Sequence, residues 1–334
     1  MLVKTTFTQE TSMTKLKLAS IFVAAAFATA ANAQEVVRLG NLKFAHYGAV
    51  SYIKEIAPKC GIKVEEHVFA KGPDVMQAIL AGELDVGATA SEAAIQGRAN
   101  GAPIYVVAGF AKGGARLVAR PDSGIKAIKD LKGKKVGVTR GGIHEVLLAA
   151  ELSQAGLTYS DQPGKDVQLV FLAFADLNQA LLGKNLDAIM QSEPQSSQAI
   201  NKGYGVEVMK PYDTPIGEPV RTMVMSEKFY STRRATAAKF MSCFVQATKT
   251  FIDDKPTAEK YVRNVIFKGQ ITADDFQDAI ANSPYTYDIT PQHIQVTTDV
   301  MNKSGVGKMR KAPVASEWVK TDLLDEAKKS LNIK

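Results

Sequence analysis

Predicted strands and helices alternate through the first two thirds of the chain, and this alternation restricts the fold more than any other feature. Extended apolar segments at 36–45, 63–69, 85–90 and 104–110 are separated by segments with helical spacing. Strands that alternate with helices form a mostly parallel sheet with helices on both of its faces. The pattern therefore predicts an α/β protein built on doubly wound sheets.

One part of this pattern occurs twice. The segment that begins at Asp74 (Asp-Val-Met-Gln-Ala-Ile-Leu) resembles the one that begins at Asp176 (Asp-Leu-Asn-Gln-Ala-Leu-Leu). In both, Gln follows Asp by three residues, which is the spacing of a capping box at a helix N-terminus. In both, Leu-Asp soon follows and opens a predicted strand. Either two amphipathic segments have converged, or the chain has two halves of similar build.

The C-terminal third is predominantly helical. An extended segment at 220–226 can return the chain to the first half. The segments after it have helical spacing, at 235–251, 257–267, 272–281, 291–301 and 317–330. A sheet that is followed only by helices predicts a helical layer packed on the first half.

The N-terminus has the features of a Sec-type signal peptide. Lys15 and Lys17 precede an apolar run at 18–31, and the run ends in Ala-Asn-Ala at 31–33. The run is shorter than the roughly 18–20 residues that span a bilayer. We expect cleavage after Ala33, and no Cys stands there to carry a lipid. The mature chain is expected in the periplasm.

Charge and cysteine content restrict the function further. The basic and acidic residues, 41 and 34 in number, are scattered rather than gathered into runs, so nucleic-acid binding has little support. An oxidising compartment permits a disulfide between Cys60 and Cys243. Both lie in apolar helical patterns, so two buried free thiols are equally compatible with the sequence.

No pattern of catalytic residues is present. The chain lacks a Gly-x-Ser-x-Gly nucleophile elbow, and His144-Glu145 lacks the second His of the zinc-protease signature. The other histidines are scattered, and the two cysteines lack metal-finger spacing. Glycine patterns of dinucleotide and phosphate-loop sites are absent. We therefore predict no enzyme, no metal and no cofactor.

Three segments resemble a known family. They are DVMQAILAGELDVGATASEAAI at 74–95, IKDLKGKKVGVTRGG at 128–142 and LNQALLGKNLDAIMQSEP at 177–194. Together with the export signal, they resemble the nitrate, sulfonate and taurine binding proteins and the NMT1/THI5-like binding proteins of ABC importers. The resemblance covers residues 35–334.

The resemblance implies a two-lobed type II periplasmic binding protein, with two doubly wound sheets joined by two crossover segments. The crossovers would lie near 117–120 and 221–224. Lobe one would comprise 35–118 and 223–334, with the C-terminal helices packed on it, and lobe two 119–222. The lobes would close on a ligand by hinge motion, because the ligand contacts both of them. A monomer that delivers its ligand to an inner-membrane permease is expected.

Ligands of such folds lie at the carboxyl ends of strands, near helix N-termini. The strongest candidate segment follows the predicted strand at 135–139. Two glycines let the backbone approach a ligand there, and free N–H groups at the helix start would bind an anion. The ligand-binding candidates of this segment are Thr139, Gly141, Gly142 and His144.

Three other strand ends supply candidates, each of which also has a purely structural explanation. Phe44 and His46 follow the first strand, where an aromatic wall could stack on a flat ligand. Thr89 and Ser91 follow the third, and Ser91 would serve equally as a helix cap. Ser192 and Glu193 follow the last strand of the repeated unit, and Arg221 lies at the second crossover. Glu193 could pair with a ligand amine or with Arg221, or simply favour a helix start.

These residues predict that the chain binds a small organic anion. The predicted class is sulfonates and carboxylates, and zwitterionic and aromatic compounds belong to it. A pyrimidine or similar heterocycle stacked on Phe44 or Tyr47 is the alternative ligand. A periplasmic enzyme, or a binder that presents its ligand to a chemoreceptor, is the alternative class of protein.

Overall fold

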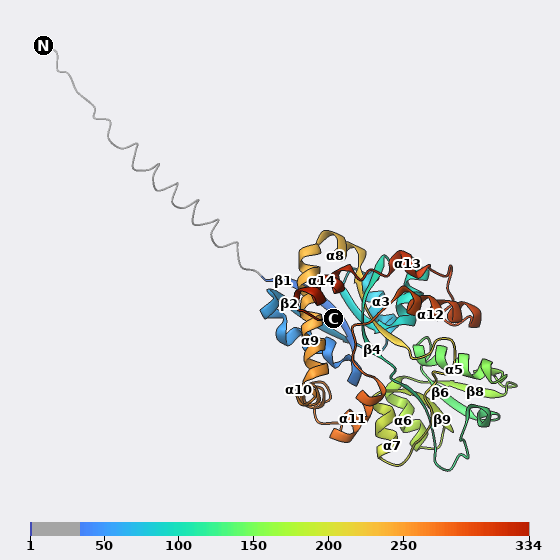
Figure 1. The fold of residues 1–334 in the computed structure, drawn as a ribbon. Helices are drawn as coiled ribbons and strands as arrows, with labels where there is room; N and C mark the ends of the chain where they lie inside the picture. The colour runs from blue at the N-terminus through green and yellow to red at the C-terminus, as the bar shows by residue number, and fades with distance from the viewer. Residues whose placement is uncertain (2–33, 334) are drawn as a thin grey trace. The chain divides into compact units, whose positions relative to one another are not determined.

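A computed structural model describes residue 1 and residues 34–333 (Figure 1). The expected signal peptide and its cleavage site fall outside these residues, apart from Met1. Residues 36–334 form one compact unit. Within the described part of the chain, no helix has both the length and the apolar character to cross a membrane.

The first sheet has five strands in the order β2-β1-β3-β11-β4. They are β1 (Glu35–Leu42), β2 (Ile62–Phe69), β3 (Val86–Ala90), β4 (Ile104–Lys112) and β11 (Val220–Ser226). Strands β1 and β3 are parallel, whereas β11 inserts antiparallel between β3 and β4. The first six residues of β11 are buried because the strand has neighbours on both sides and layers on both faces.

The second sheet has six strands in the order β10-β5-β9-β6-β8-β7. They are β5 (Ala115–Ala119), β6 (Lys135–Val138), β7 (Tyr159–Ser160), β8 (Val167–Phe171), β9 (Ala188–Ser192) and β10 (Val206–Met209). Strand β6 is parallel to β8 and β9, and β5 is antiparallel to β9 and β10. The predicted α/β class with two doubly wound sheets is confirmed.

Helices separate the strands in both sheets. In the first they are α2 (Gly48–Ile56), α3 (Gly72–Leu80) and α4 (Ser91–Ala99), with short turns η1 (Ala45–Tyr47) and η2 (Ala57–Cys60). In the second they are η3 (Ile128–Leu131), α5 (Ile143–Gln154), α6 (Phe174–Leu182) and α7 (Gln195–Asn201). In Figure 1 the second group, in green, surrounds β6, β8 and β9.

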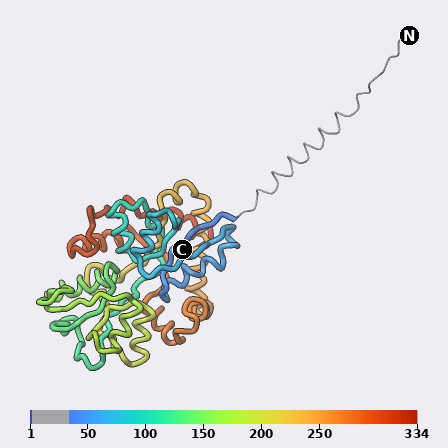
Figure 2. Tube along the Cα trace, turned by 180° about the vertical axis from the view of Figure 1, so that it is seen from behind, coloured from blue at the N-terminus to red at the C-terminus, as the bar shows by residue number. Residues whose placement is uncertain are grey.

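The helical C-terminal part runs from Glu227 onward, and Figure 2 shows its path from behind. Its helices are α8 (Glu227–Thr232), α9 (Arg234–Asp253), α10 (Lys255–Tyr261), η4 (Val262–Ile266), α11 (Ala273–Asn282), α12 (Pro291–Ser304), α13 (Ala315–Trp318) and α14 (Asp322–Ser330). Helix α9 packs on α2 and α14, as expected for a layer on the first sheet. However, α11 also packs on α7, and α12 on α5, so this layer contacts helices of both sheets.

The chain changes sheet at Gly113–Gly114, and it returns between Met209 and Val220. The expected crossovers near 117–120 and 221–224 are therefore wrong, because those residues pair as strands: Leu117 with Met190, and Met223 with Ala88. We call residues 36–112 and 220–333 the first half, and residues 115–209 the second half.

The repeated unit folds in the same way in both halves. Helices α3 and α6 each lead through Leu-Asp to a strand parallel to an earlier one. The side chain of Leu84 fills the space above Gly40, and that of Leu186 fills the equivalent space above Gly137. The predicted capping boxes are wrong, because Asp74 and Asp176 lie inside the first turn and the N-caps are Lys71 and Ala173.

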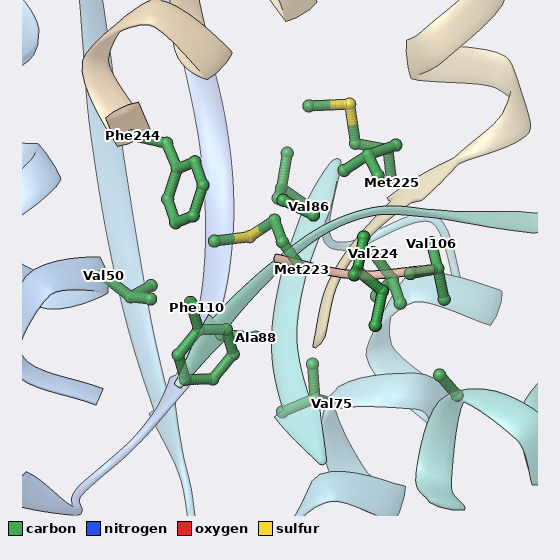
Figure 3. Packing of buried hydrophobic residues seen from close by; sticks show 14 of the residues in the cluster. Val50, Val75, Val86, Ala88, Val106, Phe110, Met223, Val224, Met225 and Phe244 are labelled. Atoms are coloured by element: carbon green, nitrogen blue, oxygen red, sulfur yellow. The ribbon is translucent and has the colours of Figure 1, made fainter. Parts of the chain in front are cut away.

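The first sheet forms the centre of the main hydrophobic core (Figure 3). Phe244 from α9 approaches one face of the sheet, and Val75 from α3 approaches the other (Figure 3). Their side chains enclose Val86, Met223 and Val224 from adjacent strands. A rigid core of this kind holds the strand ends of the first half in fixed positions.

Cys60 and Cys243 form a disulfide between η2 and α9, which settles the alternative that the sequence leaves open. The bond joins residues 183 positions apart and fixes α9 on the first sheet. Replacing both cysteines with Ala should lower the free energy of unfolding by about 2–4 kcal/mol, because the unfolded chain regains loop entropy. Urea unfolding of the oxidised wild type and the double variant measures this, and unchanged midpoints would contradict it.

Candidate functional site

A small cavity of about 30 Å³ lies where the strand ends of the two halves meet. The carboxyl ends of β1, β3, β6 and β9, with the residues that follow them, form most of its wall. The starts of α3 and α6 and one residue of β11 complete it. The lining residues are Phe44, His46, Tyr47, Lys71, Gly72, Pro73, Thr89, Ala90, Glu92, Thr139, Arg140, Gly142, Ile143, His144, Phe174, Ser192 and Arg221. As it stands, the cavity has room for one or two water molecules.

The four strand ends that the sequence singles out therefore meet at one place. The predicted residues on the wall are Phe44, His46, Thr89, Thr139, Gly142, His144, Ser192 and Arg221. Ser91, Gly141 and Glu193 are not part of it. Ser91 is also not a cap, because Ala90 is the N-cap residue of α4.

Arg221 is the strongest electrostatic feature of the cavity. Its side chain leaves strand β11, which lies between β3 and β4, and is almost completely buried, at 1% exposure. Its Nε donates to Nε2 of His46 at 3.2 Å, and its Nη2 donates to the carbonyl oxygen of Gly114 at 3.3 Å. Nη1 has no partner, and no carboxylate among the described residues lies within ion-pair distance. A buried cation without a counter-ion is costly, so the geometry favours an anionic ligand.

Two neutral histidines border Arg221. Burial, reinforced by the Arg221 charge, lowers the pKa of His144 to about 3 and that of His46 well below its usual value. Because Nε2 of His46 accepts from Arg221, its Nδ1 carries the proton and can donate. Nε2 of His144 lies 3.2 Å from the Gly114 carbonyl and must donate, so its Nδ1 is an acceptor. Within the part of the chain that the structure describes, neither Nδ1 atom has a hydrogen-bond partner.

The start of α5 differs from the sequence-based expectation. The N–H of Gly141 donates to the carboxylate of Glu145, and the N–H of Ile143 faces the carboxylate of Glu92. Internal carboxylates thus occupy two of the N–H groups that the sequence analysis offered to a ligand anion. That the remaining N–H groups at this helix start hold an anion stays a prediction.

Glu92, which the sequence analysis missed, reaches the cavity from the first turn of α4. It is 3% exposed, and its Oε2 has no hydrogen-bond partner. Burial raises its pKa to about 7, although the Arg221 charge and the N–H groups of Glu92, Ala93 and Ile143 lower it. Because Ile143 belongs to the second half, Glu92 joins the two halves across the cavity.

The raised pKa of Glu92 predicts a pH dependence of stability. The folded chain binds a proton at Glu92 up to about pH 7, whereas an unperturbed Glu releases it near 4.5. Glu92 therefore stabilises the fold most below pH 4.5, and this contribution falls between pH 4.5 and 7, by about 3 kcal/mol. Subtracting the unfolding profile of Glu92→Gln from that of wild type isolates this slope, and a flat difference would contradict it.

Glu193 occupies a different environment from the one expected. It is fully buried, and its Oε1 pairs with Nε of Arg116 at 2.6 Å. Its other oxygen accepts from the backbone N–H and hydroxyl of Ser197 at the start of α7. The expected pairing with Arg221 is not formed. Arg116 also pairs with Glu207 and with Asp278 of α11, so this network joins the two halves.

A second, outer pocket of about 380 Å³ adjoins the cavity. The two share Lys71, Thr139, Arg140 and Phe174. The guanidinium of Arg140 lies over the ring of Phe171, 3.7 Å from its centroid, and pairs with Asp161. The outer pocket is mainly apolar and offers space for the body of a ligand whose polar group enters the cavity.

A larger groove lies elsewhere, between α9, α10 and α11, with a volume of about 860 Å³. Its floor includes Phe251, Phe276 and Tyr285. None of the buried polar atoms without a partner belongs to its lining. Ligand sites need convergent polar groups as well as volume, so the inter-half cavity is the better candidate.

Two curated relatives of this chain are named as binding proteins. The chain is 33% identical over 204 residues to an Escherichia coli (strain K12) protein named for binding aliphatic sulfonates. That match covers 59% of this chain and 61% of the relative, so it spans less than two thirds of the relative's length. A Brachyspira hyodysenteriae (strain ATCC 49526 / WA1) protein, named as an ABC transporter periplasmic binding protein, is 24% identical over 80% of this chain and 82% of its own.

Solved structures show the same fold. The periplasmic aliphatic sulphonate binding protein SsuA from Escherichia coli superimposes with a TM-score of 0.72 and 20% identity, over 88% of this chain and 100% of its own. The periplasmic nitrate-binding protein NrtA from Synechocystis PCC 6803 superimposes with a TM-score of 0.70 and 15% identity, over 90% of each chain. Both confirm the predicted periplasmic binding protein fold.

The family assignment rests on a longer match. Residues 17–266 match the NMT1-like family, and this range covers most of the described fold, including both sheets and the whole wall of the cavity. The chain therefore belongs to the NMT1-like family.

Proposed function

We propose that this protein is the periplasmic substrate-binding component of an ABC importer and that it binds a small organic anion between its two halves. The observation that carries the proposal is Arg221, a buried guanidinium in a cavity to which both halves contribute. Among residues 34–333, its Nη1 has no hydrogen-bond partner and no carboxylate forms an ion pair with it. A carboxylate or sulfonate oxygen would supply both the missing hydrogen bond and the missing charge.

Opening and closing of the halves would control access. The cavity is too small for an organic anion as it stands, so the halves must separate to admit one. Gly113 and Gly114 form the shorter connection, and their φ values of 65° and 74° lie where glycine is favoured. We propose that this connection and residues 210–219 form the hinge, and that ligand contacts to both halves favour closure.

The relatives support the remaining elements of the proposal. One is named as an ABC transporter periplasmic binding protein and another for binding aliphatic sulfonates. We propose accordingly that the chain is exported, that it acts as a monomer, that a membrane permease receives the ligand, and that the cavity binds without catalysing a reaction.

A thermal-shift panel on residues 34–334 tests the proposed ligand class. The panel contains alkanesulfonates, short carboxylates, amino acids and amino sulfonates, nitrate and pyrimidines. A true ligand at 100 times its dissociation constant should stabilise the fold by about 2.7 kcal/mol. Stabilisation by pyrimidines alone would contradict an anionic ligand, and turnover of any compound would contradict a binding protein.

A further inference from the structure

The carboxyl group of Glu92 can gain or lose a proton inside the cavity near neutral pH. The residue lines the cavity, and its Oε2 is buried without a hydrogen-bond partner among the described residues. Burial raises its pKa to about 7. His46 and His144 are uncharged at that pH because burial lowers their pKa values, and Tyr47 is uncharged because burial raises its pKa.

The charged groups near Glu92 come from several elements. Arg221 of β11 is a permanent cation, since a guanidinium keeps its proton in proteins. Lys71, before α3, and Arg140, before α5, are the other cations of the wall. Glu145 of α5 accepts from a backbone N–H and lies outside the wall. Within residues 34–333, the other elements that pack on α4, namely α3, α12, β3 and β4, contribute no titratable residue to the wall.

An acidic ligand and Glu92 would share one buried cation. A ligand anion bound to Nη1 of Arg221 places a second acid group beside the Glu92 carboxyl, and the cavity that encloses them is small. Two acid groups at close range in a dry site hold one proton between them, because two adjacent negative charges repel. A sulfonate is too weak a base to take this proton, so the proton belongs to Glu92. Binding of the anion therefore favours the protonated form of Glu92.

The protonated carboxyl supplies a donor on the side that a ligand would occupy. Backbone N–H groups at the starts of α4 and α5 point to the carboxyl group of Glu92, and Oε2 is the oxygen left without a partner. A proton on Oε2 can therefore be donated to a ligand oxygen. Nη1 of Arg221 and Nδ1–H of His46 are further buried donors without partners in the described chain. Together these groups suit an ionised acid, whose oxygens only accept.

We propose, on the basis of the function proposed above, that the acid group of the ligand binds together with one proton, which Glu92 holds on Oε2. One oxygen of the acid group accepts from Nη1 of Arg221, and another accepts from Oε2–H of Glu92. Above neutral pH the empty protein has released this proton, so binding takes one up from solution. Glu92 is then a ligand-binding residue, and affinity for an ionised acid falls as the pH rises through neutrality.

Calorimetric titration of residues 34–334 between pH 6 and 9 tests this proposal. The compounds are ethanesulfonate, propionate and the tightest acid of the thermal-shift panel, and sulfonates and carboxylates are ionised throughout this range. Affinity should fall at least about tenfold from pH 6 to 9, since the protonated fraction of Glu92 falls. At pH 8, titrations in buffers of different ionisation enthalpy should show uptake of roughly one-half to one proton per ligand.

Two variants assign the proton to a residue. Glu92→Gln cannot titrate and keeps an N–H donor at this position, so its affinity should not change with pH and its binding should take up no proton. At pH 9 it should bind more tightly than wild type. Glu151→Gln is the matched control, because Glu151 is a buried carboxyl with a raised pKa outside the cavity wall. It should keep the pH dependence of wild type.

The outcomes separate this proposal from the proposed function. If an acid binds equally well at pH 6 and 9 and takes up no proton, the role of Glu92 is overturned and the anion-binding function stands. If Glu92→Gln keeps the wild-type pH dependence, another group holds the proton and the assignment to Glu92 is wrong. If no acid binds at any pH, the function proposed above fails as well. Should Glu92→Gln not fold, Glu92→Met makes the same test, because it too cannot titrate.

Discussion

Replacing Arg221 with Met should weaken binding of the anionic ligand at least about thirtyfold. The guanidinium supplies the positive charge opposite the ligand in a cavity from which water is largely excluded, and it is 1% exposed. Removing one partner of a buried charged hydrogen-bonded pair costs about 2–5 kcal/mol, which corresponds to factors of roughly 30 to several thousand. Calorimetric titration with the tightest compound of the thermal-shift panel measures the change.

Two further variants sharpen this test. Arg221→Lys should recover little, because an ammonium group cannot bond His46, Gly114 and a ligand with the geometry of the guanidinium. Arg98→Met should bind normally, since Arg98 pairs with Glu227 away from the cavity.

The effect of Arg221→Met on stability should be the opposite of its effect on binding. Without ligand, the variant should unfold at the same temperature as wild type or a higher one, because an unpaired buried cation has been removed. A large loss of stability with unchanged affinity would mean that Arg221 is a structural residue.

Replacing Arg116 with Met should lower the free energy of unfolding by about 3–5 kcal/mol. Glu193 is fully buried and pairs with Arg116 at 2.6 Å, so the substitution leaves an uncompensated carboxylate in the protein interior. It also removes the ion pair between Arg116 and Asp278 that joins the two halves. Chemical unfolding at pH 7 measures the loss.

A double variant separates the two causes of the lost stability, which are the unpaired Glu193 carboxylate and the broken ion pair between Arg116 and Asp278. Arg116→Met combined with Glu193→Gln should recover a large part of the lost stability, since no buried charge is then left unpaired. Lys63→Met serves as the comparison, because Lys63 and Glu65 form an exposed pair that solvent and salt screen. If Arg116→Met costs no more than Lys63→Met, the buried network does not stabilise the fold.

Much of the fold could be predicted from periodicity alone. The segment 220–226 was expected to be extended, and it is strand β11 with these bounds. The repeated unit was also correct, because Leu84 and Leu186 fill equivalent spaces above glycines. Strand β5 was missed because its five residues include the charged Arg116, whose partners come from distant segments.

The position of the site could be predicted better than its chemistry. The carboxyl ends of β6 and β9 meet at one edge of the second sheet, so local sequence sufficed to bring Thr139 and Ser192 together. Thr89 comes from the first sheet, and its place beside them was expected only from the family resemblance. The partners of each carboxylate depend on tertiary packing. The sequence offered Glu193 a ligand, Arg221 or a helix start as its partner, but Arg116, 77 positions earlier, pairs with it. Glu92 in turn occupies one donor at the start of α5, the N–H of Ile143, which local sequence could not show to be taken.

A crystal structure of residues 34–334 with the tightest compound of the panel tests the central claim most directly. We predict that the acidic group of the ligand lies between the two halves, within hydrogen-bond distance of Nη1 of Arg221. The same electron density should contact the Thr139 or His144 side of the wall. A ligand bound in the groove between α9, α10 and α11, with Arg221 left unpaired, would contradict it.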